Sequence, residues 1–267
     1  MTTKFTIRDM LKCGVHFGHK TNKWNPSMAQ FIHGTKGNVH IIDLRKTFNL
    51  LTSTLDVIAQ HAKSNNKILF VGTKKQLSST IAKHASDAKQ YYVNQRWLGG
   101  MLTNWATVSN SIKTLKETEA EIANPESNLT KKEKVYLTKK LVKLEAYLGG
   151  IKDMKGTPDL MIVFDTEKES IAIQEANKLN IPVVAIVDSN SSLEGINFPI
   201  PGNDDSAKSV SFFCEQFTQI INKTRTIAPK SVIKTETKPK TEAKAEKKAE
   251  TMPKAEAKTE KKAETKK

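Results

Sequence analysis

Histidine and cysteine side chains gather near the start of the chain with a spacing that could bind zinc. Cys13, His16 and His19 are spaced as Cys-x-x-His-x-x-His, and His33 and His40 follow. Imidazole and thiolate groups are common zinc ligands. However, no Cys-x-x-Cys pair accompanies them, the second cysteine is distant in the sequence, and no fourth ligand is evident. We therefore expect no bound metal, and we expect these histidines to pack in the core or to contact RNA.

Acidic side chains follow two predicted strands and begin a predicted helix. Asp165 and Asp188 each stand at the end of an apolar run, and Asp204 and Asp205 precede a helical pattern. Ligands of open α/β sheets collect at the carboxyl ends of strands, so a Mg²⁺ or phosphoacceptor site is one interpretation. Helix capping and loop hydrogen bonding are the other, and they are more common roles of aspartate at such positions. We favour the second interpretation.

A short turn with one glycine and two lysines could hold a phosphate group. Its residues, Gly72-Thr73-Lys74-Lys75-Gln76, follow a predicted strand and open a predicted helix, where backbone amides can bind an anion. The sequence has no GxxxxGK(S/T), GxSxG or HExxH motif, and no GxGxxG after a strand. A contact with an RNA phosphate, a solvated lysine pair and a nucleotide site are the alternatives, in that order of preference. We expect neither enzymatic activity nor a cofactor.

The three tryptophans stand among amide and basic side chains. Trp24 lies in KTNKWNP, Trp97 in NQRWLGG, and Trp105 follows Asn104. Flat rings stack on bases, while lysine, arginine and asparagine bind phosphates and base edges. A buried core position is the alternative for each ring, and for Trp97, which precedes Leu98, the two interpretations are equally supported.

The basic residues are concentrated at the two ends of the chain. Residues 1–105 hold 15 Lys+Arg against 4 Asp+Glu, a net charge of +11, and residues 230–267 hold 13 against 7, a net +6. Residues 106–229 hold 15 against 17. A folded segment with a charge of +11 presents a surface that attracts a polyanion, most commonly nucleic acid. A generic basic surface without a partner is the alternative.

Composition predicts an intracellular globular protein. Apolar residues make up 37% of the chain, and the longest apolar runs are far too short to cross a membrane. The N-terminal residues lack the apolar core of a signal peptide, and two cysteines are too few for a disulfide framework. We therefore expect a cytoplasmic protein with no membrane contact.

Apolar runs and helical patterns alternate along most of the chain. Strands are expected at 39–44, 68–71, 91–93, 160–164 and 183–187, and helices near 45–63, 75–88, 168–179 and 206–222. Four of the strands are continuous apolar runs, which is typical of parallel strands covered on both faces. Thr166 and Glu169 have the spacing of a capping box ahead of the third helix. The pattern predicts an α/β fold with a mostly parallel sheet.

Residues 104–150 interrupt the alternation with two heptad patterns. The apolar positions are Val108, Ile112, Leu115 and Ile122, then Leu137, Leu141, Leu144 and Leu148. Asn124-Pro125 ends the first helix, Thr130 with Glu133 caps the second, and Gly149-Gly150 ends it. An antiparallel coiled-coil hairpin that projects from the sheet is expected, and two helices packed flat on the body are the alternative.

The chain divides into three predicted parts. Residues 1–103 and 151–227 form the α/β domain, and residues 104–150 form the inserted hairpin. Residues 228–267 are a Lys/Glu/Ala/Thr mixture that can bury little apolar surface, and we expect a disordered tail there.

Seven stretches form an ordered set of motifs: GVHFGHKTNKWNP (14–26), HIIDLRKT (40–47), KILFVGTKKQ (67–76), YVNQRWLGGMLTN (92–104), LGGIKDM (148–154), IPVVAIVDSN (181–190) and IPGNDD (200–205). Their sequences and their order resemble the S-two family of small-subunit ribosomal proteins, over roughly residues 5–225. The resemblance implies a flavodoxin-like parallel sheet flanked by helices, with a coiled-coil hairpin at 104–150.

The resemblance also implies a function. The family is a non-catalytic, rRNA-binding component of the small ribosomal subunit, located between head and body, and is associated with docking of the large S-one ribosomal protein. No homo-oligomer is expected. Carried over by position, the implied RNA-binding residues are His16, His19, Lys20, Lys23, Trp24, Asn25, Lys74, Lys75, Asn94, Gln95, Arg96, Trp97 and Asn104. The chain departs from the family where VDSN (187–190) continues as SSLE in place of a proline-containing loop.

Overall fold

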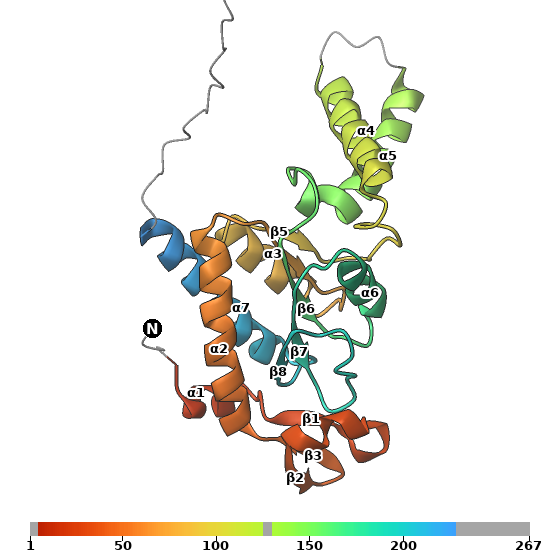
Figure 1. Cartoon of the computed structure of the whole chain (residues 1–267). Helices are drawn as coiled ribbons and strands as arrows, with labels where there is room; N and C mark the ends of the chain where they lie inside the picture. The colour runs from red at the N-terminus through yellow and green to blue at the C-terminus, as the bar shows by residue number, and fades with distance from the viewer. Residues whose placement is uncertain (1–4, 125–129, 228–267) are drawn as a thin grey trace, which may run out of the picture. The chain divides into compact units, whose positions relative to one another are not determined.

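The structure is a computed structural model of the chain that describes residues 5–124 and 130–227 (Figure 1). The tail predicted at 228–267 lies outside the described residues. No helix in the described ranges combines the length and the apolar character that a membrane span requires.

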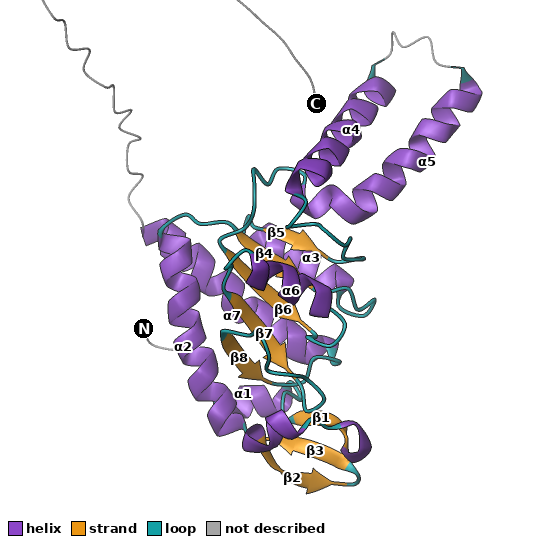
Figure 2. Ribbon diagram, turned by 45° about the vertical axis from the view of Figure 1, so that its right-hand side comes forward, coloured by secondary structure: helices purple, strands orange, loops and turns teal. Residues whose placement is uncertain are grey.

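Five parallel strands form the central sheet, in the order β5-β4-β6-β7-β8 (Figure 2). Their bounds are β4 Ile68–Val71, β5 Tyr91–Val93, β6 Leu160–Phe164, β7 Val183–Val187 and β8 Phe198–Pro201. Every residue of β4, β6 and β7 is buried, which confirms that these apolar runs are covered on both faces. Four of the five expected strands, β4, β5, β6 and β7, have the predicted bounds. β8 was not predicted, because its two prolines weaken the pattern; they are tolerated on this edge strand.

Helices cover the two faces of the sheet and create two separate apolar cores. The first core contains Phe70, Ile162 and Ile186 and is closed by α1 Ile7–Lys12, α2 Leu44–Lys63, α3 Ser78–Asp87 and α7 Ala207–Ile227. The second core contains the alternate strand residues Val71, Val163 and Val187 and is closed largely by α6 Ser170–Lys178 and the base of the inserted hairpin. The alternation of side chains along each strand assigns successive residues to opposite cores.

The strand expected at 39–44 belongs to a second, smaller sheet. β1 Phe17–Lys20, β3 Val39–Ile42 and β2 Ile32–Lys36 pair antiparallel in that order. The strand ends at Ile42 because Asp43 caps α2 by accepting a hydrogen bond from the amide of Arg45 at 3.0 Å. β1 and β2 were not predicted. They are short and polar, and they are linked by the 3-10 turns η1 Thr21–Lys23 and η2 Pro26–Phe31.

The described residues of the 104–150 segment form two helices that lie side by side, α4 Trp105–Ala123 and α5 Lys131–Leu148 (Figure 2). The apolar seam of α4 is buried at Val108, Ile112 and Leu115, as predicted, and continues through Thr118. The capping box of Thr130 and Glu133 is confirmed. The helix α5 ends at Leu148 and continues into the 3-10 turn η3 Gly149–Ile151. That the pair is a true coiled coil stays a prediction.

Candidate nucleic-acid interface and the adjoining charge cluster

Three of the residues predicted to bind RNA are exposed where the small sheet ends. Lys20 is the last residue of β1, Lys23 is in η1, and Trp24 follows with 41% of its surface exposed. Neither lysine makes an ion pair within the described ranges. The indole lies 5.6 Å from the ring of His40, centroid to centroid. We call Lys20, Lys23 and Trp24 the N-terminal surface.

Hydrogen bonds fix the backbone beside this surface. The side-chain oxygen of Asn25 accepts hydrogen bonds from the amide and the hydroxyl of Ser27, at 3.0 and 2.9 Å. The amide of Asn25 donates to the carbonyl of Ser189 at 2.8 Å. Asn25 therefore has a structural role. Its hydrogen bonds fix the backbone directly after Trp24.

His16 is half-buried against a neighbouring aromatic ring. Its imidazole lies 4.0 Å from the ring of Phe17, and its Nδ1 atom has no hydrogen-bond partner within the described residues. Burial lowers the pKa of His16. His16 is therefore a neutral packing residue at pH 7, rather than a cation that could bind a phosphate.

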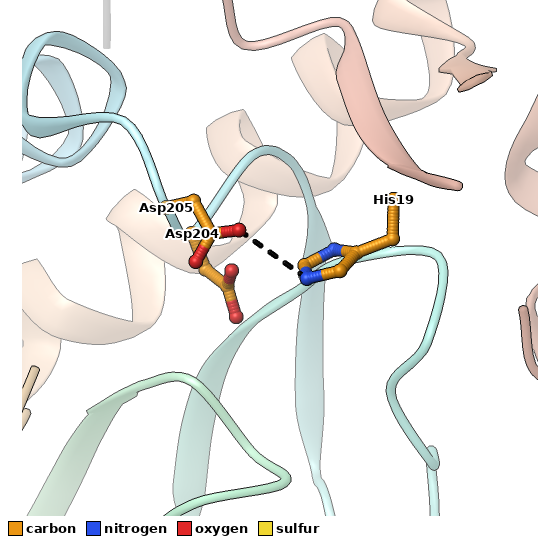
Figure 3. Close-up of side chains that lie close together, drawn as sticks. All are labelled: His19, Asp204 and Asp205. Atoms are coloured by element: carbon orange, nitrogen blue, oxygen red, sulfur yellow. Dashed lines mark ion pairs between the residues drawn. The ribbon is translucent and has the colours of Figure 1, made fainter. Parts of the chain in front are cut away.

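His19 points inward, toward the carboxyl ends of the central strands. Its Nδ1 atom lies 2.9 Å from Asp188. Its Nε2 atom lies 3.3 Å from Asp205, the contact drawn as a dashed line in Figure 3. The contact with Asp188 raises the pKa of His19 to about 9, against the opposing effect of burial. The side chain is therefore an imidazolium at pH 7 that joins the small sheet to the central sheet.

Lys74 also points inward and joins three carboxylates. Its ammonium lies 3.0 Å from Asp165, 2.8 Å from Asp204 and 2.7 Å from Asp205. Burial alone would lower the pKa of Lys74, but the carboxylates, Asp204 foremost, raise it above its ordinary value. The lysine that the turn after β4 was expected to offer to a phosphate is thus held by groups of the protein itself.

These residues form what we call the charge cluster: His19, Lys74, Asp165, Asp188, Asp204 and Asp205. Four carboxylates face two cations, so the cluster carries an excess of negative charge. Burial, followed by the charge of Asp188, raises the pKa of Asp204 to about 7, although Lys74 lowers it. The cluster lies at the carboxyl ends of the central strands, where α/β folds commonly bind ligands. The ammonium of Lys74 occupies the position that a cationic ligand would take among these carboxylates.

The backbone of β1 lies close to the loop that follows β7, and a glycine makes this approach possible. A Cβ atom on Gly18 would lie 2.9 Å from the hydroxyl of Ser189 and 3.2 Å from the carbonyl of His40. The same hydroxyl accepts a hydrogen bond from the amide of His19 at 2.8 Å. A larger residue at position 18 would push β1 away from the end of β7, so glycine is required there.

One group of side chains in the described ranges could hold a metal ion. His19, Asp204 and Asp205 each offer a ligand atom, and these atoms lie within 4.8 Å of one another (Figure 3). The zinc site that the sequence analysis considered and did not favour, Cys13 with His16 and His19, is not among the possible metal-binding groups of the described residues. An ion bound by the two carboxylates would compete with Lys74, which already contacts both. The absence of a metal stays a prediction.

The loop that follows β5 is organised by a buried carboxylate on α6. Glu175 accepts hydrogen bonds from the indole of Trp97 at 3.1 Å and from the amides of Gly100, Leu102 and Thr103 at 2.7–3.1 Å. Burial alone would raise the pKa of Glu175, but these hydrogen bonds lower it. Sequence reasoning missed this residue. Its signal was an acidic residue among the apolar positions of α6.

Trp97 is therefore a core residue. Its side chain is buried, and its only polar atom donates to Glu175. Asn94 and Gln95 donate to Ser78 at the start of α3, at 3.1 and 3.4 Å, whereas Arg96 is exposed. This loop offers the charge of Arg96 to a partner, but not the flat ring that the sequence suggested.

Another predicted feature, the capping box of Thr166 and Glu169, is wrong. Glu169 is buried and accepts hydrogen bonds from the amide and the hydroxyl of Thr73, at 2.9 and 2.6 Å. The carboxylate of Asp165 instead accepts hydrogen bonds from the amides of Glu167 and Lys168, both at 3.1 Å. Local spacing could not predict this because Thr73 lies 96 residues away from Glu169 in the sequence.

Several of the predicted RNA-binding side chains remain open to solvent. Asn104 precedes α4 and accepts a hydrogen bond from the hydroxyl of Thr107 at 3.0 Å, but its side chain does not cap the helix. Lys75 is exposed beside the inward-facing Lys74. The exposed members of the predicted set are Lys20, Lys23, Trp24, Lys75, Gln95, Arg96 and Asn104.

Comparison with known proteins identifies the family. A family model described as "Ribosomal protein S2" matches residues 10–224. The small ribosomal subunit protein uS2 of Sinorhizobium medicae is 52% identical over 211 residues, which cover 79% of this chain and 83% of that protein. The uS2 protein of Ehrlichia ruminantium (strain Gardel) is 51% identical over 218 residues, or 82% of this chain and 76% of that protein. The chain therefore belongs to the ribosomal protein S2 family and is a structural component of the small ribosomal subunit, not an enzyme.

Proposed function

We propose that the N-terminal surface binds ribosomal RNA of the small subunit. The observation that carries the proposal is an exposed indole, Trp24, that directly follows Lys23 and stands four residues after Lys20, two exposed lysines that make no ion pair within the described ranges. Ammonium groups neutralise phosphates and release counterions. The ring can stack on an unpaired base. The fixed backbone at Asn25 supports both contacts, because little conformational freedom is lost on binding.

A salt series tests this proposal. Full-length Lys20→Gln/Lys23→Gln is compared with the parent chain and with Lys139→Gln/Lys140→Gln, which removes the same charge from the exposed face of α5. Affinity for small-subunit rRNA is measured in KCl from roughly 50 to 200 mM, a range over which the affinity due to phosphate contacts falls steeply. The log–log slope should flatten by about 0.7–0.9 per true contact, and only for the first variant.

Trp24 provides an independent readout. Trp24→Ala should weaken rRNA binding by about 1–3 kcal/mol with an unchanged salt slope if the ring stacks on a base. A core ring would instead cost roughly 3–5 kcal/mol of folding stability. An unaltered affinity for both the lysine pair and Trp24→Ala would place the RNA on another face.

We also propose that the chain helps to dock a neighbouring ribosomal protein, the S-one protein among them. Three apolar side chains near the N-terminus support this role: Ile7, Leu11 and Phe17 are about half exposed. The first two lie one turn apart on α1, and Phe17 packs beside Gly14, just after that helix. Adjacent exposed apolar groups are typical of protein-binding sites.

Subunit purification tests the docking role. Leu11→Gln/Phe17→Gln should leave the chain on the small subunit and reduce the amount of S-one protein that co-sediments with it. Ile171→Gln is a matched control, because Ile171 is exposed on α6 in another part of the body. Normal co-sedimentation of the S-one protein with the double variant would exclude this patch.

A further inference from the structure

A cavity of about 420 Å³ lies at the base of the helical hairpin, apart from the N-terminal surface. One wall is α4 from its first residue to Lys116, with Trp105, Ser109 and Lys113, and the other is the segment after η3, which contributes Lys152 to Gly156. Its volume is within the range of about 300–1,000 Å³ that is typical of small-ligand sites. We call it the hairpin-base cavity.

The charge of this cavity is strongly positive. Four lysines and one carboxylate, Asp153, line it. Lys116 binds Asp153 at 3.1 Å, and the ammonium of Lys152 is paired with Glu119. Lys113 and Lys155 are exposed and make no ion pair in the described part of the chain. Two lysines that line the cavity are therefore exposed and make no ion pair within the described ranges, so each is available to an anion.

The walls also offer a flat ring and a tight turn. Trp105 is half-buried against the second apolar core, so its indole is held by packing while part of it remains open. Gly156 has a φ of +92°, a backbone conformation that favours glycine. The first turn of α4, which carries the positive end of the helix dipole, is not capped by the side chain of Asn104.

We propose that the hairpin-base cavity binds one unpaired nucleotide of RNA, with the base against Trp105 and the flanking phosphates at Lys113 and Lys155. A flat indole beside ammonium groups is the arrangement that recognises single-stranded nucleotides. An acidic protein segment would use the ammonium groups but has no need of the indole. This inference rests on the proposed RNA-binding function and adds a second, separate site to it.

Binding of a fluorescein-labelled octauridylate to the full-length chain tests the inference by anisotropy over a KCl series. Lys113→Gln/Lys155→Gln should flatten the log–log slope by about 1.4, or about 0.7 for each single-strand phosphate contact. Trp105→Ala should weaken binding roughly 5- to 150-fold without changing the slope. Trp105→Phe keeps a ring in the wall and should retain most of the affinity, so it separates stacking from misfolding. Lys139→Gln/Lys140→Gln is the matched charge control.

The outcomes distinguish this site from the N-terminal surface. If Lys20→Gln/Lys23→Gln reduces binding but Lys113→Gln/Lys155→Gln and Trp105→Ala do not, the cavity is not an RNA site and the proposed function stands. If only the cavity variants reduce binding, the inference stands and the N-terminal surface is wrong. If poly-L-glutamate binds as tightly as the RNA, and Trp105→Ala affects neither ligand, the cavity is a docking site for acidic protein and the inference is overturned.

Discussion

Replacement of Lys74 by glutamine should destabilise the fold, although lysine side chains rarely do so. In the turn after β4, Lys74 and Lys75 are adjacent, and sequence alone gives both the same role. In the structure one ammonium binds three carboxylates, whereas the other is exposed. Glutamine at position 74 could still donate a hydrogen bond, but it would leave Asp165, Asp204 and Asp205 without the charge that compensates them.

The size of the stability loss in Lys74→Gln follows from the burial of the carboxylates that Lys74 contacts. Asp165 and Asp204 are 5% and 1% exposed, and removal of one partner from a buried ion pair costs about 3–5 kcal/mol. The lower end applies, because Lys74 itself is 21% exposed, Asp205 is 56% exposed, and Asp204 can take up a proton. For a domain of this size, about 3 kcal/mol corresponds to a fall of roughly 6–12 °C in Tm. Lys75→Gln should change the stability by no more than about 0.5 kcal/mol.

The pH dependence gives a second readout with a definite sign. Burial already raises the pKa of Asp204 to about 7, and loss of Lys74 raises it further. A carboxyl group with a raised folded-state pKa stabilises the fold at low pH, and this contribution is lost as pH rises through that pKa. The deficit of Lys74→Gln relative to the parent should therefore be smaller at pH 5.5 than at pH 7.5.

Thermal melts of the full-length parent, Lys74→Gln and Lys75→Gln at the two pH values provide the assay. Circular dichroism at low temperature checks that each variant folds. Equal melting temperatures for the two variants at pH 7.5 would refute the reasoning, since they would show that the ammonium of Lys74 does not hold the charge cluster together.

Three further predictions concern His19, Glu175 and the binding of metal. The pKa of His19 is raised from 6.5 to about 9 in the folded chain, so its contribution to folding stability, at most about 3 kcal/mol, is present below pH 6.5 and lost as pH rises through 9. Between pH 6 and pH 10, the free energy of urea unfolding should therefore fall more for the parent than for His19→Gln. Glu175→Gln should cost about 2–4 kcal/mol and shift the fluorescence of Trp97, because the NH2 group that replaces one carboxylate oxygen cannot accept the hydrogen bonds made to that oxygen. An unchanged melt would contradict this. Elemental analysis of the purified chain should find no stoichiometric metal, and one ion per chain, lost in His19→Ala, would overturn that prediction.

The sequence predicted best the parts of the fold that are buried on every side. β4, β6 and β7 have the predicted bounds because a strand covered on both faces must be apolar at each position, and such runs are visible without any knowledge of the partners. β1 and β2 have no comparable pattern. They exist because β3 pairs with both, and because a glycine at position 18 lets β1 approach Ser189 closely.

The roles of individual charged residues could not be predicted, because they depend on partners that are distant in the sequence. His19 meets Asp188, and Lys74 meets Asp204 and Asp205, only after the parallel strands align their carboxyl ends. The same is true of Trp97, which sits among amide and basic residues in the sequence but donates its only N–H group to Glu175 on α6. Composition gives the sign of a surface charge, but it does not show which cations already have acidic partners inside the protein.

This distinction narrows the predicted RNA-binding face. The charge of +11 in residues 1–105 predicted a basic surface, and the family resemblance placed Lys74 among the RNA-binding residues. Lys74 is held inside by carboxylates from the C-terminal half, so its charge holds the two halves together instead of binding a partner. Lys20 and Lys23 differ from Lys74, because both are exposed and neither makes an ion pair within the described ranges. Because both are exposed and both precede the exposed ring of Trp24, they are the lysines whose loss should affect RNA affinity most and stability least.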